Sequence, residues 1–406
     1  MTMDLTGPKP QPLGVLPWPA GMLLLPDVPE AEQTAASILQ GVTPEVWPES
    51  LRFYELGLTG DPGQAAALVD GDDFVSRYNR AVLIGGEGVW EGLADQTSGE
   101  LGALVAMARF SVGQIDEPPS AEGLHGEVAA MVHSARASAA LERRDAQAAV
   151  DELRAAVGAA DSAPSPILAA SLRLTLAQIL SDAGDAASAA READVALQRL
   201  PMTADRELRA HLQVTRALAR QSVVGEERGA LLAVVGDLTE ATKIFREETH
   251  PELFALCNQH LALAYLVMPM SDEGDRIRLG VAVNALRAAL RIYTPQTHPA
   301  QWTSTQTNLA NALQYLPSVH QQENLDEAVQ LYEEVLQYRD PQVDPLGYAR
   351  ILSNQGNALG HLGVFTDAKE RLERARDMFA TAGDMDAAAT VSGILAGLEE
   401  AAGSRA

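Results

Sequence analysis

A helical unit that occurs twice within residues 298–379 constrains the fold of this chain more than any other feature. The second copy follows the first after 46 residues, and a weaker third copy opens 48 residues upstream, at His250. Repeats with a period of about 20 to 50 residues are typical of solenoids, in which each unit packs only on its neighbours. The sequence therefore predicts an array of stacked helices. The equivalent positions of the two best copies are Asn308 and Asn354, Asn311 and Asn357, Ala312 and Ala358, Leu313 and Leu359, and Leu316 and Leu362.

The composition agrees with closely stacked helices. Hydrophobic residues make up 47% of the 406 residues, whereas aromatic residues make up only 5%. The apolar material is therefore mostly alanine, leucine and valine, and alanine and leucine are the best helix formers. We expect an all-α chain, whose length does not require several separate cores because a repeat array grows without them.

The charge of the chain argues against two classes of partner. Acidic residues outnumber basic residues by 55 to 30, which gives a formal net charge of -25. A phosphate backbone or an anionic membrane would repel such a chain, so we expect no nucleic acid and no membrane partner. Residues 1–120 are the most acidic, with 17 Asp and Glu against 5 Lys and Arg. We interpret this excess as a solvated face, with a basic partner as the alternative.

Several signals favour a cytoplasmic protein. Cys257 is the single cysteine, so one chain can form neither a disulfide nor a thiolate-rich metal site. The apolar segment 14–25 contains Pro17 and Pro19 and lacks a small-residue cleavage site, so we do not interpret it as a signal peptide. No apolar run reaches the roughly 18 residues that a membrane helix needs.

Two units carry a pattern of a known family. A leucine beside a small residue, a glycine turn and alanines that pack a helix pair recur at helical intervals. This pattern resembles the tetratricopeptide repeat, which is a pair of antiparallel helices. The matching residues are Leu176, Ala177, Leu180, Gly184, Ala189, Ala193, Ala196 and Pro201 in one unit, and Leu352, Gly356, Leu359, Gly363, Ala368, Leu372 and Ala375 in the other.

The resemblance implies an all-α, right-handed superhelical solenoid of six or seven antiparallel helix pairs. We divide the chain into a proline-rich extended arm at 1–48, divergent acidic tetratricopeptide-like helices at 49–118, clearer repeats at 119–249, and long-period repeats with a C-terminal capping helix at 250–406. The arm holds nine of the 22 prolines, which remove backbone donors and fix φ. We expect its apolar residues, Trp18 and 22–25, to pack on the array, with a docking peptide as the alternative.

Three prolines mark expected helix starts. Pro251, Pro299 and Pro345 suit the first helical position, where no backbone donor is needed. The residues before them are therefore interpreted as helix starts rather than as ligands. We further expect a long turn at 317–324, a final helix at 385–400, and core positions for most large aromatic residues. The residues before the three prolines are His250, His298 and Asp344, and the aromatic residues are Trp47, Trp90, Trp302, Tyr54, Tyr78, Tyr265 and Tyr315.

The resemblance also implies that the first helix of each pair lines a concave groove and that the second forms the outer wall. The first helices expected at 168–180, 304–316 and 346–362 contain no Asp or Glu, despite the large negative charge of the chain. The second helices carry many acidic residues instead. We therefore expect a neutral groove that is rich in amides.

Four asparagines form the candidate peptide-binding site in this groove. Asn308 and Asn311 are one helical turn apart and share a face, and Asn354 and Asn357 repeat this arrangement one unit later. Each carboxamide offers an acceptor and two donors, which match the amide and the carbonyl of an extended peptide. Similar paired asparagines line the peptide grooves of several tetratricopeptide families, so the resemblance implies a site that holds the peptide main chain.

Other residues extend or limit this site. Arg350 and His361 lie on the helix of the second pair and are expected to contact a carboxylate, although His361 without any function is an alternative. His260 and Leu263 replace the two asparagines of the upstream copy, so the amide row should end there. A structural role, in which the asparagines bridge neighbouring first helices, is the alternative to peptide contact, and a different ligand is the third possibility.

The sequence contains no pattern of a catalytic, cofactor or metal site. Segment 85–88 is rich in glycine but lacks the strand and the spacing of a phosphate-binding loop. Cys257 and His260 have the spacing of two ligands on one helix, but no further ligand is nearby. We therefore predict no catalytic residue, no cofactor and no metal.

Together these features predict a non-catalytic scaffold or adaptor that binds an extended peptide segment of a partner protein in its groove, with regulation or maturation of that partner as one role. The alternative is a helical-solenoid enzyme, or a sensor of small molecules or peptides, with a pocket near the N-terminal arm. The sequence leaves open the identity of the partner and whether the chain forms a homo-oligomer.

Overall fold

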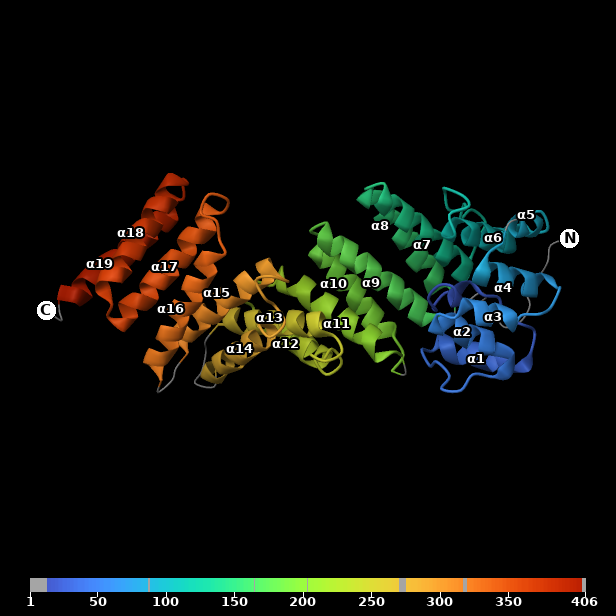
Figure 1. The fold of residues 1–406 in the computed structure, drawn as a ribbon, viewed down its shortest axis with the longest axis horizontal. Helices are drawn as coiled ribbons and strands as arrows, with labels where there is room; N and C mark the ends of the chain where they lie inside the picture. The colour runs from blue at the N-terminus through green and yellow to red at the C-terminus, as the bar shows by residue number, and fades with distance from the viewer. Residues whose placement is uncertain are drawn as a thin grey trace. The chain divides into compact units, whose positions relative to one another are not determined.

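The chain is helical wherever it has regular secondary structure in the part that the structure describes. A computed structural model describes residues 13–403 except 87, 164, 203, 270–274 and 317–319, and no strand occurs among them. From α2 to α11 and again from α12 to α19, each helix packs against the next one along the chain (Figure 1), which confirms the predicted all-α class with antiparallel helix pairs. The helices are η1 (Ala20–Met22), α1 (Pro29–Leu39), η2 (Glu49–Leu51), α2 (Arg52–Thr59), α3 (Pro62–Ala67), α4 (Phe74–Ile84), α5 (Val89–Ala94), α6 (Gly99–Ser111), α7 (Gly126–Glu142), α8 (Ala146–Asp161), α9 (Pro166–Asp182), α10 (Ala186–Arg199), α11 (Arg206–Gln221), α12 (Arg228–Ala241), α13 (Pro251–Val267), α14 (Asp275–Ala289), α15 (Pro299–Tyr315), α16 (Gln321–Gln337), α17 (Pro345–Leu362), α18 (Phe365–Thr381) and α19 (Met385–Gly403).

The helices divide into two compact units, Met1–Val223 and Val224–Ala406. In the first unit α7 pairs with α8 and α9 pairs with α10, while α11 packs on both α9 and α10. In the second unit α12 packs on α13, and the pairs α13 with α14, α15 with α16 and α17 with α18 follow, before α19 packs on α18. The domain boundaries drawn from the sequence stay predictions.

Local sequence signals explain the tight turns of the first unit. The chain leaves α9 through Gly184, whose φ of 84° is in the left-handed region that glycine adopts without strain. The next helix begins at once because the side chain of Asp185 accepts a hydrogen bond from the backbone amide of Ser188 at 3.1 Å. Asp145 caps α8 in the same way, with the amide of Ala148 at 3.0 Å.

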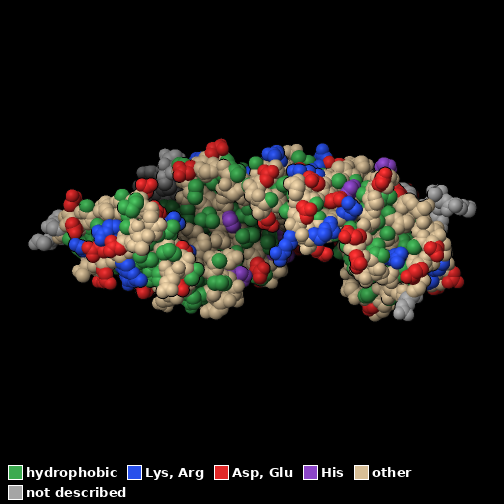
Figure 2. All heavy atoms as spheres, turned by 90° about the horizontal axis from the view of Figure 1, so that it is seen from above, with side chains coloured by type: hydrophobic (Ala, Val, Ile, Leu, Met, Phe, Trp, Pro, Cys, Tyr) green, Lys and Arg blue, Asp and Glu red, His purple; other side chains and the backbone are tan. Residues whose placement is uncertain are grey.

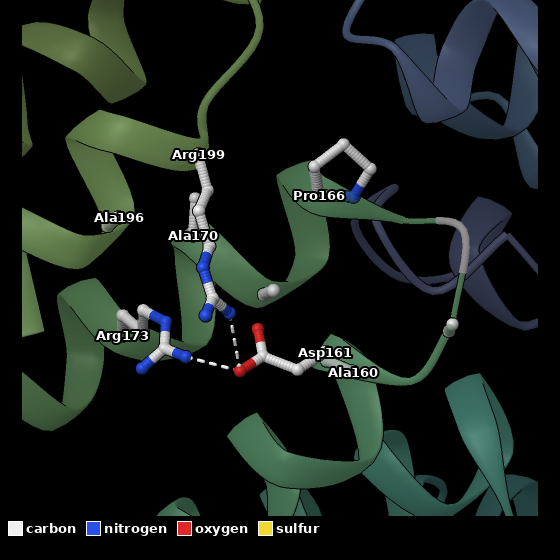
Figure 3. A pocket seen from close by; sticks show the side chains of 9 residues that line it. Ala160, Asp161, Pro166, Ala170, Arg173, Ala196 and Arg199 are labelled. Carbon is white, nitrogen blue, oxygen red and sulfur yellow. Dashed lines mark hydrogen bonds and ion pairs between the residues drawn. The ribbon is translucent and has the colours of Figure 1, made fainter.

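The helix pairs of the first unit are also held by ion pairs around a small pocket of ≈ 130 Å³. Asp161 at the end of α8 accepts from Arg173 of α9 and, at 2.9 Å, from Arg199 of α10 (Figure 3). Arg173 also binds Glu192 of α10 at 2.6 Å. Because the two arginines are balanced by two carboxylates, we interpret this cluster as a brace between three helices rather than as an anion site.

The described part of the N-terminal arm lies in the core of the first unit. Leu13, Leu23 and Leu25 are completely buried among the side chains of the first helices. This confirms the expected packing for residues 22–25. The expectation for Trp18 was wrong, because this side chain is 46% exposed; the chain turns there into η1, which buries Ala20 and Met22 instead.

One arm residue is bound through its main chain by an asparagine. The amide of Leu24 donates to Oδ1 of Asn79 at 2.8 Å, and Nδ2 of Asn79 donates to the carbonyl of Leu24, also at 2.8 Å. The hydroxyl of Tyr54 donates to the carbonyl of Leu23 at 2.6 Å. Asn79 and Tyr54 are fully buried, so these bonds satisfy the main chain of the arm where water cannot reach it.

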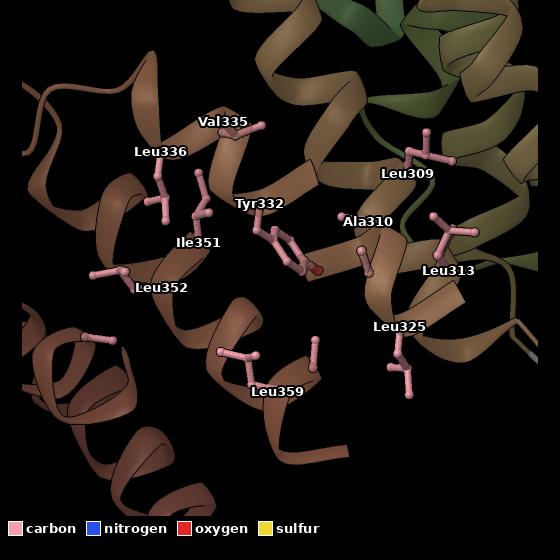
Figure 4. Packing of buried hydrophobic residues seen from close by; sticks show 14 of the residues in the cluster. Leu309, Ala310, Leu313, Leu325, Tyr332, Val335, Leu336, Ile351, Leu352 and Leu359 are labelled. Carbon is pink, nitrogen blue, oxygen red and sulfur yellow. The ribbon is translucent and has the colours of Figure 1, made fainter. Parts of the chain in front are cut away.

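The core of the second unit repeats from pair to pair. Leu309 and Leu313 of α15, Tyr332 of α16, and Leu352 and Leu359 of α17 belong to one cluster of buried side chains (Figure 4). Small residues let the helices approach, since Ala312, Ala328, Ala358, Ala368 and Ala375 are all 2% exposed or less. The alanine and leucine positions of the repeat therefore specify stacking, as the sequence predicts.

The expected helix starts are confirmed, whereas two expectations for turns and aromatic residues need correction. His250, His298 and Asp344 are the N-cap residues of α13, α15 and α17, each followed by proline. The long turn expected at 317–324 is shorter, because α16 already begins at Gln321; residues 317–319 lie outside the described part. Among the aromatic residues, Trp90, Trp302, Tyr54 and Tyr78 are buried, but Tyr315 is 64% exposed.

None of the described helices combines the length and the apolar character needed to cross a membrane.

Candidate functional site

Two parallel rows of side chains on α15 and α17 contain all six residues of the predicted site. Within each row the residues are spaced by four, three and four positions, so they lie along one face of their helix. The asparagines in the middle are partly buried, and the end residues are exposed. We call this surface the amide face; it consists of Ser304, Asn308, Asn311 and Tyr315 on α15 and Arg350, Asn354, Asn357 and His361 on α17.

A hydrogen-bond network joins the two rows. Nδ2 of Asn354 donates to Oδ1 of Asn311 at 2.9 Å, and the hydroxyl of Tyr332 donates to the same oxygen at 2.6 Å. The Tyr332 hydroxyl itself accepts a hydrogen bond from Nε2 of Gln314. Burial raises the pKa of Tyr332 well above its ordinary value, so the hydroxyl keeps its proton and acts as a donor to Asn311. The network fixes the orientation of the two central carboxamides.

The network reaches one more asparagine but not the fourth. Nδ2 of Asn357 is 3.4 Å from Oε1 of Gln314, which is a long hydrogen bond. Asn308 has no hydrogen bond to any described residue. By analogy with the pair of Asn354 and Asn311, the partner of Asn308 would come from α13. Leu263 occupies that position, and its apolar side chain cannot form a hydrogen bond with Asn308.

The asparagines are therefore partly structural and partly available. The Asn311–Asn354 pair bridges two first helices, as the structural alternative predicts. Within the described part of the chain, Nδ2 of Asn311, Oδ1 of Asn354 and the whole carboxamide of Asn308 have no hydrogen-bond partner. One free donor and one free acceptor on adjacent side chains match the carbonyl and the amide of a peptide unit.

The two basic residues of the amide face are also available. Arg350 and His361 are exposed, and neither forms an ion pair or hydrogen bond with a described residue. In the upstream copy, burial lowers the pKa of His260 to about 4 and keeps its ring neutral. Among the residues of the amide face, Arg350 of α17 is the one with a permanent positive charge, and it lies beside the asparagines.

Acidic side chains are directed to the other side of these helices. Glu334 of α16 accepts from Nε2 of Gln306 at 2.6 Å, and Glu333 of α16 accepts from Nε2 of Gln355 at 3.0 Å. Neither α15 nor α17 contains an acidic residue. Figure 2 shows acidic and basic side chains interspersed over the visible face, so the net charge of the chain does not gather there into a single acidic patch.

Sequence reasoning missed three residues that shape the amide face. Gln314 and Tyr332 orient the carboxamides, and Tyr315 adds an exposed ring at the end of the α15 row. The spacing of four residues from Asn311 to Tyr315 could have placed that ring on the amide face. No comparable signal identifies Gln314 and Tyr332, because their pairing depends on how α15 and α16 pack.

The described residues include no group of three or more His, Cys, Asp or Glu side chains that could hold a metal ion. Cys257 is buried, and burial raises the pKa of its thiol to about 12. A thiol with such a pKa stays protonated at neutral pH, which disfavours both metal binding and nucleophilic attack.

Among known proteins, this chain is similar to several solved structures at low sequence identity. No protein-family model and no curated protein matches the chain. One similar solved structure is a signal transduction ATPase with a tetratricopeptide repeat sensor from Pyrococcus horikoshii, with 13% identity and a TM-score of 0.46; the match covers 90% of this chain and 59% of that one. The antiparallel helix pairs of this chain, together with the repeat pattern of their sequences, resemble tetratricopeptide repeats. The match with this chain covers less than two thirds of the length of that ATPase.

Two further similar structures contain a bound molecule. The Rap protein complexed with competence and sporulation factor has 13% identity and a TM-score of 0.39, over 93% of this chain and 100% of that one. The human IFIT1 dimer with m7Gppp-AAAA has 12% identity and a TM-score of 0.29, over 86% of this chain and 93% of that one. The expected absence of a nucleic-acid partner stays a prediction.

Replacing Tyr332 with phenylalanine is expected to reduce the free energy of unfolding of the second unit by about 1–2 kcal/mol, because Gln314 and Asn311 each lose a buried partner. Urea unfolding would measure this change. Tyr315→Phe is the matched control; its hydroxyl is on an exposed side chain, so its effect should stay within about 0.5 kcal/mol. Equal stability of the two variants would contradict the network.

Proposed function

We propose that this protein is a non-catalytic interaction scaffold that binds an extended peptide segment of a partner protein across the amide face. The observation that carries the proposal is the pairing of Asn79 with Leu24, in which a helical asparagine of this same chain binds both main-chain groups of an extended segment. Asn308 offers the same two groups, without a partner among the described residues. The amide face would bind the main chain of a partner segment in the same way that Asn79 binds the main chain of the arm.

The chemistry of the amide face suits a main chain better than a charged ligand. Its four asparagines are neutral, and the free groups of Asn311 and Asn354 can form hydrogen bonds with the main chain of any sequence. Arg350 then adds one cation that can pair with an acidic side chain or with the carboxylate at the end of the peptide. We therefore propose a partner segment that is extended and carries an acidic group near the α17 side.

Replacing Asn308 with alanine is expected to weaken peptide binding by roughly 30-fold, since a net hydrogen bond to the main chain contributes about 1 kcal/mol and two are lost. Its thermal stability should not change, because Asn308 has no hydrogen-bond partner among the described residues. To measure this, the full chain is panned against a displayed library of short random peptides. The affinity of a selected peptide for the wild type and for the variant is then determined by fluorescence anisotropy.

Asn354→Ala is the companion variant, and it should affect both properties. It removes the hydrogen bond to Asn311 and a group offered to the peptide, so affinity and melting temperature should both fall. A library that yields no peptide for the wild type, or a selected peptide that binds Asn308→Ala as well as the wild type, would overturn the proposal. A mobility-shift assay with an RNA oligonucleotide would test the expectation that the acidic chain does not bind nucleic acid.

A second candidate is a small-molecule sensor with its site beside the arm. An open pocket of ≈ 410 Å³ lies there, lined by Val15 and Pro17 of the arm together with residues of α9, with Glu207 of α11 and with Asp205, the N-cap residue of α11. Its volume falls within the range of ligand sites, about 300–1,000 Å³. Thermal shift against a panel of small amines would test this alternative, since the two carboxylates favour a cationic ligand.

A further inference from the structure

An open pocket of ≈ 310 Å³ adjoins the α17 end of the amide face. Asn357 and His361 line it from α17, and Ile394, Gly397 and Leu398 line it from α19. No Asp, Glu, Lys or Arg is among its lining residues. In an acidic chain, a pocket of this kind without acidic side chains is suited to an apolar group, and its volume lies at the lower end of the range of ligand sites, about 300–1,000 Å³.

A change in the repeat sequence explains why the pocket occurs at this place. Between α15 and α17 the gap is filled by the side chain of Gln314, which contacts Asn357 and Tyr332. One unit later, glycine at position 360 replaces Gln314, and leucine at position 372 replaces Tyr332. The smaller pair leaves space beside Asn357, although Leu398 approaches Gly360 closely enough that an added Cβ would lie 2.8 Å from it.

The arm shows how an extended segment uses such a pocket. Asn79 holds the main chain of Leu24, and the side chains of the flanking residues, Leu23 and Leu25, are completely buried. In this molecule, a main chain held by asparagine is therefore accompanied by apolar side chains in adjacent pockets. Asn357 stands in the same relation to the α17–α19 pocket, because it lines the pocket and lies in the amide row.

We propose that this pocket binds a bulky aliphatic or aromatic side chain of the peptide, next to the residue whose main chain pairs with Asn357. This inference rests on the proposed function and specifies the class of peptide that the amide face selects. The partner segment would carry an apolar anchor residue, while its main chain contributes binding that is independent of sequence. Selectivity for the partner would then come from the pocket, and the asparagines would supply affinity.

Filling the pocket from α19 tests this inference. An added Cβ at Gly397 meets no atom within 4 Å, so Gly397→Leu should place its side chain in the pocket without displacing a neighbour. Gly393→Leu is the matched control, because an added Cβ there also meets no atom within 4 Å and position 393 does not line the pocket. Each variant replaces an exposed glycine of α19 with a better helix former.

The full chain and both variants would be panned against the same library of displayed random peptides. We expect peptides selected by the wild type to share a bulky apolar residue at one position, and to bind Gly397→Leu at least roughly ten-fold more weakly while binding Gly393→Leu normally. Wild-type peptides without a shared apolar residue, or equal binding to both variants, would overturn the inference and leave the main-chain proposal intact. Selection of no peptide by the wild type would overturn both.

Discussion

Replacing Asn79 with alanine should lower the free energy of unfolding of the first unit by roughly 2–4 kcal/mol, because the amide and the carbonyl of Leu24 would both be left buried without a partner. Both lost hydrogen bonds are to the main chain of the arm, so the arm should be the part that opens most easily. Hydrogen exchange at the amide of Leu24 should accelerate, and urea unfolding of the first unit should shift to lower concentration.

The control for this variant is Asn308→Ala, which makes the same change on a helix of the second unit. Asn308 has no hydrogen bond to a described residue, so its removal should change stability by no more than about 0.5 kcal/mol. Asn79 is the only asparagine in residues 1–223, so no other carboxamide of that kind is available in the first unit. Unchanged exchange at Leu24 in Asn79→Ala would show that the pairing does not hold the arm.

These two asparagines also show what the sequence reveals and what it withholds. The repeat period, the prolines at helix starts and the glycine turns are local signals, so the helix pairs of the second unit follow from them directly. The pairing of Asn79 with Leu24 joins positions 55 residues apart, and no local signal carries such a contact. The arm is recognisable from its prolines, but its binding mode is not.

The same limit applies to the amide face. Helical spacing places Asn308 and Asn311 on one face, and the structure agrees. The bond between Asn311 and Asn354 depends on how far α17 is shifted along α15, which side-chain packing decides. From the sequence, bridging of neighbouring first helices and contact with a peptide are alternatives. In the structure, the hydrogen bond between Asn354 and Asn311 bridges two first helices, while Asn308 has no hydrogen-bond partner among the described residues. Peptide binding at these residues stays a prediction.

Replacing Glu127 with glutamine should stabilise the first unit at high pH, which is the opposite of the usual effect of losing a carboxylate. Glu127 lies in the first turn of α7 and is 2% exposed, and neither of its oxygens has a hydrogen-bond partner among the described residues. Burial raises the pKa of Glu127 from 4.5 to about 8, although the nearby amides of Gly14 and Val15 of the arm oppose this shift.

The sign of the pH dependence follows from this raised pKa. Between pH 4.5 and about 8 the folded state keeps a proton on Glu127 that the unfolded state has released, so this group makes the protein less stable as the pH rises. The stability that comes from this retained proton is complete below pH 4.5 and is lost above about pH 8. The advantage of Glu127→Gln over the wild type should therefore grow by about 1.4 kcal/mol per pH unit across this window, to a total on the order of 3–5 kcal/mol.

A carboxylate of the same helix pair provides the matched control with the opposite sign. Burial raises the pKa of Glu152, but hydrogen bonds from His133 and Arg136 outweigh this effect and hold it below its ordinary value. Glu152→Gln should thus destabilise the protein above the ordinary pKa of a glutamate, and the loss should vanish as the pH falls through the lowered value. Urea unfolding of the wild type and both variants across the pH range would distinguish the two carboxylates. A constant difference between Glu127→Gln and the wild type would mean that Glu127 is hydrated where it meets the arm, and that the arm is not sealed against water at Gly14 and Val15.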